Sequence, residues 1–475
     1  MRYFEIICLS ILLFVSGYLR FAQLGYSDFY GDETKTLYFR KDVSASNFLL
    51  NQRKGPVQFV SSWVVEKVTG VFNEAYIRFP FALAGFLSVT AVYILVRLLF
   101  GFKSALISTA LFSLNGFMLA FSRTAQYQSF LILFGLLSII FAYLFFKELS
   151  IKNRYYLFLS AFFLGLAFLS HYDAVFFGLV TIFILTQKVI SDKVVFKGVI
   201  LFFVLPLVFI ISAFYIPYIS SGYFQKNTIN YVSKRISGKE YKPNNSYYTY
   251  KVYNPSYGSS IILFFGFLSL IFLKSWKRYM LLIWFGVPFL LFEIVFSNPG
   301  THILNYVIPL VIFSGVFLNY LTMFLGSRVK IFHGYLVIFV FILVFVVSQA
   351  QVFVPVLNNG YPWIGNKVNN KYNLFLYGFP YNRCWRQVRG YFLQNGMPRS
   401  FYTNDNITIG EWYLRGIPSK IITDSQFPEV YISVNNNHEY RIEDKEVLGR
   451  YEIIKEFGSA RDTSKTFIMK YRPVK

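Results

Sequence analysis

The chain has 475 residues, of which 55% are apolar and 15% are charged, and its formal net charge is +23. Soluble globular proteins carry about a quarter charged residues, so this composition excludes an ordinary soluble domain and favours a membrane protein. Most of the basic excess lies in the apolar part of the chain, where it needs no partner beyond anionic lipid headgroups, so we do not expect nucleic-acid binding. The two cysteines, Cys8 and Cys384, lie in different regions and form no disulfide framework.

The apolar residues occur in long blocks. A transmembrane helix needs about 20 mainly apolar residues, because its backbone groups must be hydrogen-bonded within the segment. Eleven blocks fit this description, and they lie near residues 3–20, 78–97, 104–121, 124–146, 155–170, 174–187, 198–216, 258–273, 279–296, 303–324 and 331–350. We therefore predict an α-helical polytopic membrane protein with about eleven transmembrane helices. The two short blocks beside His171 are counted separately because a polar trio, HisTyrAsp, divides them.

Lysine and arginine gather in every second connection between these blocks. Thirteen basic residues lie on the N-terminal side, opposed only by Glu148 and Asp192. Short loops with such an excess stay in the cytoplasm, so we predict a cytoplasmic N-terminus and an extracytoplasmic C-terminus. The first block is interpreted as a retained helix, because no small-residue cleavage site follows it. No eukaryotic retrieval signal ends the chain, which favours the plasma (inner) membrane of a prokaryote.

The composition changes near residue 350, and we predict two domains. Residues 1–350 form a polytopic transmembrane catalytic domain, and residues 351–475 form a small soluble extracytoplasmic α/β domain. In the second region, strand-like pieces at 400–403, 420–423 and 430–434 alternate with a helical stretch at 384–394. Acceptor recognition and scaffolding are both consistent with this domain.

The first long outer connection, residues 21–77, carries the most informative pattern. Two amphipathic stretches in it predict helices lying along the membrane surface. Asp32 and Glu33 follow a glycine soon after the first block. Two adjacent carboxylates cannot both be ionised cheaply in a partly desolvated pocket, so one could act as a general base. An ordinary solvated turn explains the same pair, and the spacing by itself favours that interpretation.

The AspGlu pair, the proline-containing turn after it and a helix that opens with ArgPhePro at 78–80 resemble the C-type membrane glycosyltransferases. Within this superfamily the pattern is most similar to the protein O-mannosyltransferases and the lipid A aminoarabinose transferases, which are glycosyltransferase family 39-like. Further matches follow in the same order at 76–101, 121–128, 165–173 and 299–309. The resemblance covers about residues 20–325 and rests on the order, spacing and outer-face placement of these motifs.

This resemblance implies an inverting transfer of a sugar from a polyprenyl-phosphate donor to a hydroxyl of a lipid, glycan or protein acceptor. It implies that Asp32 is the general base, with Glu33 beside it in the catalytic pair. Lys54 and Arg123 are expected to bind the phosphate, because cations must receive the charge of the leaving group. Arg123 could instead extend to lipid headgroups. The chain has LysGlyPro at 54–56 where members often have HisProPro, so the role of that turn is open.

Further substrate-binding candidates lie in the other matched segments. They are Gln126, Tyr127, His171, Tyr172, Asp173, His302 and Tyr306. His171 and His302 could line one cavity, where they would contact the sugar or support a weakly held divalent metal. Their spacing gives no metal-site signature, and histidines satisfied at helix ends explain it as well. No other cofactor is indicated.

Residues 217–257 form a second long outer connection, with six basic residues, one acidic residue and nine tyrosines. A lid over a lipid phosphate and a surface loop resting on anionic lipid both fit this composition.

Two other classes of protein compete with the transferase. A transporter or flippase of a lipid-linked saccharide should show internal repeats and ionisable residues near the bilayer midplane. The chain shows no repeat, and its polar residues gather at the outer ends of the blocks. A structural or receptor-like membrane protein leaves that outer-face clustering unexplained.

Overall fold

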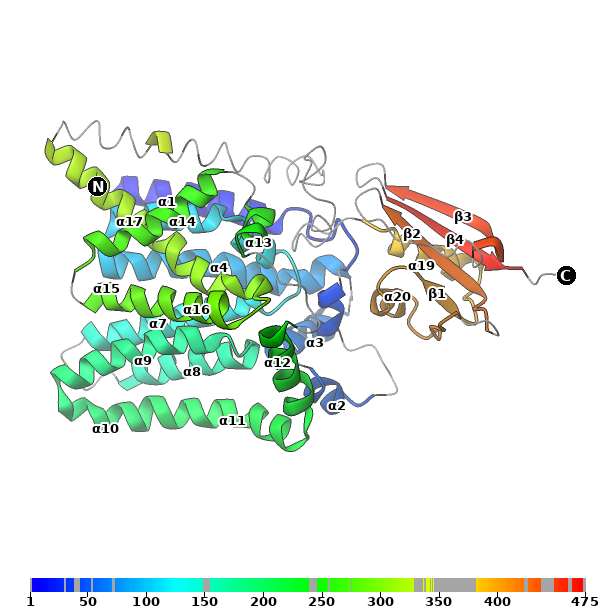
Figure 1. Cartoon of the computed structure of the whole chain (residues 1–475), viewed down its shortest axis with the longest axis horizontal. Coiled ribbons are helices and arrows are strands. Elements are labelled where there is room, and N and C mark those ends of the chain that lie inside the picture. The colour runs from blue at the N-terminus through cyan, green and yellow to red at the C-terminus, as the bar shows by residue number, and fades with distance from the viewer. Residues whose placement is uncertain are drawn as a thin grey trace.

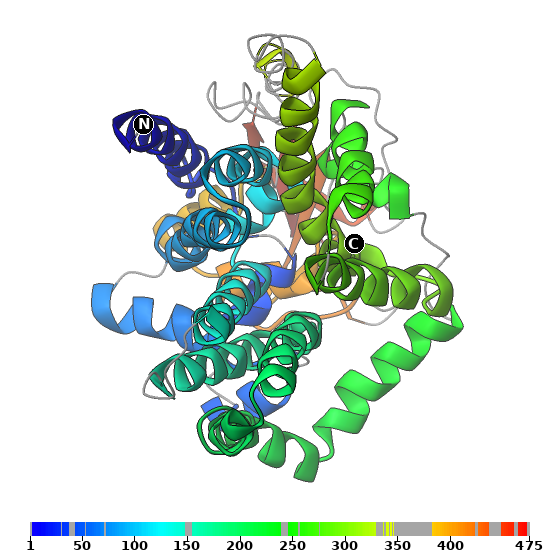
Figure 2. The same cartoon turned by 90° about the vertical axis from the view of Figure 1, so that its left-hand side faces the viewer.

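The computed structural model consists of a bundle of helices and a small α/β unit at one end of it (Figure 1). It describes residues 2–472 except for 30, 38–42, 53, 71–72, 148–153, 239–245, 255–256, 275, most of 329–381, 423–425, 437–447 and 460–463. Figure 2, which looks along the bundle, shows many of its helices nearly end-on.

The bundle follows the apolar blocks of the sequence. Its helices are α1 (Arg2–Phe21), α4 (Glu74–Phe100), α5 (Phe102–Leu114), α6 (Gly116–Ser122), α7 (Gln128–Lys147), α8 (Arg154–Ser170), α9 (Ala174–Ser191), α10 (Phe196–Val199), α11 (Leu205–Ser220), α14 (Tyr257–Phe272), α15 (Trp276–Leu281), α16 (Val287–Leu290) and α17 (Leu304–Arg328), with π-helical turns joining α10 to α11 and α15 to α16. Ten predicted blocks therefore coincide with helices. The eleventh, 331–350, lies almost wholly outside the described residues.

Fewer helices than predicted meet a length criterion for crossing a membrane. Among the described residues six helical segments are long and apolar enough, or seven if the bent pair α5 and α6 counts as one span. Helices α8 and α14, with 17 and 16 residues, are shorter than the ~20 residues that a perpendicular crossing needs. The prediction of about eleven spans is therefore not confirmed.

The surface of the bundle is suited to lipid. In the apolar segment Lys193–Ser220, which contains α11, only 17% of the most apolar window is buried inside the protein. Large apolar side chains on this segment, such as Phe209 and Ile216, are mostly exposed. A continuous exposed apolar face on a helix of this length is expected of a protein embedded in a bilayer.

The predicted block at 104–121 is not one straight helix, because α5 and α6 meet at Asn115 with a bend of 62°. The Asn115 side chain caps α6 by accepting a hydrogen bond from the amide of Phe117 at 3.0 Å. The amide of Gly116 donates to the Asn254 side chain at 2.8 Å, and a Cβ at Gly116 would lie 1.7 Å from the Tyr253 carbonyl oxygen. The polar AsnGly pair therefore ends α5, and Gly116 lets the backbone at Tyr253 pack directly against the start of α6.

Short helices of the long outer connections lie at the end of the bundle that faces the α/β unit (Figure 1). They are the 3-10 helix η1 (Gly31–Thr36), α2 (Ala45–Leu50), α3 (Val57–Thr69), α12 (Asn230–Ser237) and α13 (Ser246–Tyr253). The two helices predicted in the first connection therefore exist as α2 and α3. Several large apolar side chains of α3, including Val60 and Trp63, are exposed, as expected for a helix at a membrane surface.

The α/β unit contains one four-stranded sheet of order β1-β2-β4-β3, with β1 parallel to β2 and the other pairs antiparallel. Its elements are α19 (Trp385–Asn395), β1 (Phe401–Thr403), α20 (Ile407–Tyr413), β2 (Val430–Asn436), β3 (Tyr451–Ser459) and β4 (Ser464–Tyr471). The predicted helix at 384–394 and strands at 400–403 and 430–434 are confirmed. The predicted strand at 420–423 is wrong for its described residues, 420–422, which belong to no strand. The preceding residue, Ser419, forms an isolated bridge with Phe401.

The α/β unit packs against the first outer connection through buried polar contacts. The fully buried carboxylate of Asp28 accepts hydrogen bonds from the amide of Arg383 at 2.9 Å, just before α19, and from that of Trp385 at 3.2 Å, the first residue of α19. The Tyr413 hydroxyl donates to Glu74 and accepts from the amide of Phe29. These contacts tie the loop before η1 to the α/β unit. The predicted domain boundary at 350 falls outside the described residues and stays a prediction.

We expect Asp28→Ala to destabilise this docking by about 2 kcal/mol, because it removes a helix cap and leaves buried amides without acceptors. The measurement is the rate at which a protease releases the C-terminal unit from the detergent-purified protein. Asp28→Asn is the control, since an asparagine oxygen can still cap α19. Equal release from wild type and Asp28→Ala would contradict the prediction.

Candidate active site

The two adjacent carboxylates of η1 lie in different environments. Glu33 is fully buried and accepts two hydrogen bonds from the guanidinium of Arg78, from Nε at 2.8 Å and Nη2 at 2.7 Å. Glu33 also accepts from the amide of Ala125 at 2.9 Å. The side chain of Asp32 is 27% exposed and forms ion pairs with Lys35 and Lys54. Glu33 thus anchors η1 to α4 and to the turn after α6, while Asp32 stays accessible.

The buried Lys54 is the cation beside Asp32, with 3.6 Å between its Nζ and Oδ2 of Asp32. Its turn is held against the end of α8, where the amide of Gly55 donates to the carbonyl of Ser170 at 3.3 Å. A Cβ at Gly55 would lie 1.9 Å from the carbonyl oxygen of Leu169, so only glycine permits this approach. The LysGlyPro sequence therefore brings an ammonium group to the carboxylate.

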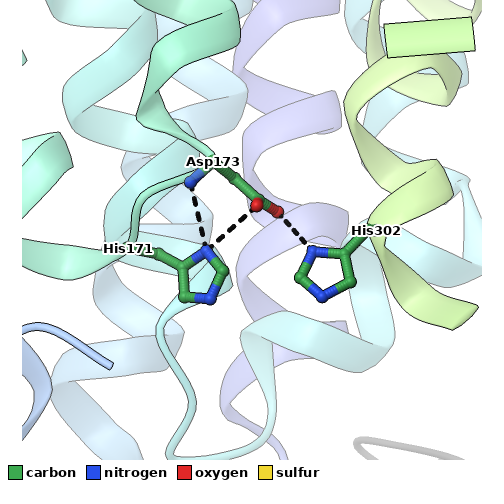
Figure 3. A group of neighbouring side chains, drawn as sticks. All are labelled: His171, Asp173 and His302. Carbon is green, nitrogen blue, oxygen red and sulfur yellow. Dashed lines mark hydrogen bonds and ion pairs between the residues drawn. The ribbon is translucent and has the colours of Figure 1, made fainter. Parts of the chain in front are cut away.

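An aromatic stack leads from Lys54 to a polar cluster. The Lys54 ammonium lies over the ring of Tyr127, 5.1 Å from its centroid, and Tyr127 stacks on His171 with 3.8 Å between ring centroids. The carboxylate of Asp173 then contacts both histidines, with 3.2 Å to Nδ1 of His171 and 2.8 Å to Nδ1 of His302 (Figure 3). All three cluster residues are buried.

The charge state of this cluster follows from its burial. Burial lowers the pKa of His171 to about 4, so the imidazole is neutral near pH 7. Burial by itself raises the pKa of Asp173, but His302 and His171 outweigh it and hold that pKa well below its usual range. Asp173 is therefore an ionised carboxylate at neutral pH.

The same cluster fits the donor set of a metal ion. One donor atom from each of His171, Asp173 and His302 lies within 4.8 Å of the others. Histidine and carboxylate ligands are those that zinc and related divalent ions take. His302 lies in the 3-10 helix Gly300–Ile303 that precedes α17, and the other two lie between α8 and α9, so no local spacing in the sequence could reveal the site.

Arg123 has a different environment from Lys54. It is buried, and its Nη1 donates to the carbonyls of Leu19 at 2.7 Å and Ala22 at 2.9 Å, at the C-terminal end of α1. These contacts satisfy carbonyls that a helix end leaves unpaired. The assignment of Arg123 to a phosphate stays a prediction.

The remaining candidates, Tyr172, Tyr306 and Gln126, differ in their contacts. The half-buried ring of Tyr172 lies nearly parallel to the ring of His302, with 6.1 Å between the ring centroids. Tyr306 donates its hydroxyl to Glu293 at 2.6 Å. Gln126 is buried, and its amide nitrogen has no hydrogen-bond partner among the described residues.

Two residues of the site were not predicted. Arg78 holds Glu33, and the signal for it was an arginine at the start of an apolar block, where an unpaired charge is costly. Asn305 donates its side-chain amide to Asp173 at 2.9 Å. It had no comparable signal, because an asparagine near the start of a helix is ordinary.

An apolar cavity of about 530 Å³ opens beside the LysGlyPro turn. It is lined by residues of α3, α4, α7 and α8 and by Pro56, which belongs to that turn. Representative lining residues are Val60, Leu83, Leu87, Phe134 and Leu166. The cavity therefore runs along apolar helices from a point two residues away from Lys54.

Comparison with known proteins identifies the fold. A sequence model of the family described as dolichyl-phosphate-mannose-protein mannosyltransferase matches residues 53–214, which include Lys54 and His171 but not Asp32. No curated protein matches the chain. ArnT from Cupriavidus metallidurans, solved with undecaprenyl phosphate bound, has a TM-score of 0.62 at 15% identity, and the match covers 97% of each chain.

This chain has the C-type membrane glycosyltransferase fold. The apo state of the same ArnT has a TM-score of 0.58 at 14% identity, with 98% of this chain and 97% of that chain covered. The arabinofuranosyltransferase AftD from Mycobacteria has a TM-score of 0.52 at 12% identity, covering 99% of this chain and 40% of that one. The predicted resemblance to this superfamily is confirmed, and the chain is a multi-pass membrane protein.

Proposed function

We propose that this protein transfers a sugar from a polyprenyl-phosphate donor to an acceptor hydroxyl. The transfer inverts the configuration at the anomeric carbon, and Asp32 is the general base. The observation that carries the proposal is the pairing of the accessible Asp32 carboxylate with the buried Lys54 ammonium, 3.6 Å away, in a turn whose Pro56 lines an apolar cavity. A carboxylate, a cation and an apolar cavity are the three features that a lipid phosphate donor and a hydroxyl acceptor require together.

The two charges divide the chemistry. Asp32 removes the proton of the acceptor hydroxyl as the new glycosidic bond forms. The bond to the phosphate breaks on the opposite face of the sugar, and the departing lipid phosphate takes the bonding electrons and is stabilised by Lys54. Glu33 and Arg78 act as positioning residues in this scheme, because their buried ion pair holds the helical turn that carries Asp32.

The apolar cavity suits the prenyl chain of the donor. Its lining is formed by apolar side chains of four helices, and Pro56 joins it to the Lys54 turn. A prenyl chain bound in this cavity would bring the donor phosphate close to the ammonium group of Lys54. The ArnT structure with undecaprenyl phosphate bound is consistent with a lipid phosphate ligand for this fold.

We further propose that the site faces the outer side of the membrane. The short helices η1, α2, α3, α12 and α13 lie at the end of the bundle beside the α/β unit, whereas α10 and α15 begin at the other end (Figure 1). Basic residues gather around the starts of α10 and α15, which favours a cytoplasmic position for that end. They are Lys188, Lys193 and Lys197 near α10, and Lys274, Lys277 and Arg278 near α15. The N-terminus is then cytoplasmic and the α/β unit extracytoplasmic.

The decisive test uses the full chain purified in detergent and given a panel of polyprenyl-phosphate sugars with crude envelope acceptors. Mass spectrometry follows the free polyprenyl phosphate and the glycosylated acceptor. We expect both products from at least one donor. Folded protein that releases nothing from any donor, yet moves labelled lipid across vesicle membranes, would replace the proposal with a transporter or flippase.

Lys54→Gln is expected to raise KM for the donor about 10- to 100-fold, because a hydrogen bond to a charged group contributes about 1.5–3 kcal/mol. Lys35→Gln is the matched control, since Lys35 also pairs with Asp32 but its side chain is 49% exposed. We expect a change of less than about threefold for the control, because exposed ion pairs contribute little. Equal effects of the two variants on KM would remove Lys54 from the phosphate site.

A further inference from the structure

The cluster of His171, Asp173 and His302 is built around one buried carboxylate, that of Asp173. Within the described part of the chain, the Asp173 carboxylate is contacted by the two histidines and by the Asn305 amide. Lysine and arginine are not among these partners. A buried carboxylate is usually paired with a positive charge or bound to a metal.

A second buried group, the side chain of Asn305, contacts the same carboxylate and has an acceptor atom that no described residue uses. The amide nitrogen of Asn305 donates to Asp173 at 2.9 Å and to the carbonyl of His302 at 3.0 Å, which determines how the side chain is oriented. Its oxygen, Oδ1, is buried and accepts no hydrogen bond from any residue that the structure describes. An acceptor in this position is suited to a water molecule that is itself held by a cation.

The distances within the cluster suit metal coordination. Tetrahedral ligands with metal–nitrogen and metal–oxygen bonds of about 2.1 Å lie about 3.4 Å apart. The separation between His171 and Asp173 is 3.2 Å, and that between His302 and Asp173 is 2.8 Å. The two contacts end on different oxygens of the carboxylate, Oδ1 facing His171 and Oδ2 facing His302, and the donor atoms of the three residues all lie within 4.8 Å of one another. Binding of one cation therefore requires side-chain shifts of about 1 Å. It also displaces the hydrogen bond that Nδ1 of His171 accepts from the amide of Asp173 at 3.2 Å. Figure 3 shows both imidazole rings directed at the one carboxylate.

We propose that His171, Asp173 and His302 bind a divalent cation of the zinc class, and that Oδ1 of Asn305 accepts a hydrogen bond from a water on that cation. Three protein ligands and one water form the open type of zinc site. The stacked rings of Tyr127 and His171 lie between this cation and the ammonium group of Lys54. Its effect there, which rests on the proposed function, is to add positive charge near the departing phosphate.

The test measures metal binding without any glycosyl donor. Full-length protein in detergent is stripped with a chelator and titrated with zinc chloride, and the bound zinc is counted by mass spectrometry. Cobalt(II) serves as a second probe, because its visible absorption reports tetrahedral coordination. We expect one zinc per wild-type chain, and an affinity at least tenfold weaker for His302→Gln, for Asp173→Asn and for Asn305→Leu.

Asp192→Asn is the matched control. Asp173 and Asp192 flank the same helix, α9, at its opposite ends, so the control removes a carboxylate without touching the cluster. The control is expected to bind zinc as wild type does, and each variant must keep its melting temperature in chelator. Equal zinc binding by wild type and by His302→Gln, or no binding by folded wild type, would overturn the proposal. Because no donor is involved, this outcome is independent of whether sugar transfer is detected.

Discussion

Asp32→Asn is expected to lower kcat for release of polyprenyl phosphate by about 10²- to 10⁴-fold, the range that a positioned general base contributes. An asparagine amide has nearly the shape of the carboxylate but cannot accept the proton of the acceptor hydroxyl. The side chain of Asp32 is 27% exposed and pairs with Lys35 and Lys54, so its neutralisation should leave folding intact. The measurement is mass spectrometry of the released lipid at saturating donor.

The kinetic pattern separates a base from a binding residue. KM for the donor should change by less than about fivefold in Asp32→Asn, since the lost interaction belongs to the transition state. The melting temperature in detergent must match that of wild type. A variant that keeps more than a tenth of the wild-type kcat would exclude Asp32 as the base while leaving the transferase itself in place.

Arg78→Met is expected to destabilise the protein by about 3–5 kcal/mol, because removal of one partner leaves a buried charge uncompensated. The lost guanidinium bonds both carboxylate oxygens of Glu33, whose side chain is 0% exposed. It also donates to the carbonyls of Leu24 and Ser27 at 2.7 and 2.9 Å. The loss is measured as a fall in the midpoint of thermal unfolding in detergent.

Arg97→Met tests whether this cost comes from burial. Arg97 lies near the other end of α4 and pairs with Glu5 at 2.9 Å, but its side chain is 54% exposed. We expect less than about 1 kcal/mol for this control. The double variant Glu33→Leu, Arg78→Met should recover part of the loss, since no charge then stays buried. Equal melting of the two single variants would show that the Glu33–Arg78 pair does not hold η1.

The local sequence determined the helices and the position of several breaks. Apolar blocks form helices because a helix satisfies its backbone within one segment, and the polar trio at 171–173 ends α8 before α9 begins. The AsnGly pair at 115–116 carried the same kind of signal. It was missed because the block around it remains apolar on average, although the helix bends by 62° there.

The candidate site shows which information the sequence lacked. Asp32 and Lys54 could be named from their order along the chain, but not the 3.6 Å between them. The sequence also did not show that Arg78, 45 residues later, lies against Glu33. Asp173 meets His302 across 129 residues, a contact that no local spacing encodes.

By itself, then, the sequence determined that this is a membrane protein of apolar helices with polar groups gathered in its long connections, because helix formation and solvent preference depend on nearby residues. The tertiary structure decided which carboxylate is accessible, which cation is its neighbour and which histidines share an aspartate. Burial and pairing depend on segments that are distant in the chain, and only packing of the bundle brings those segments together.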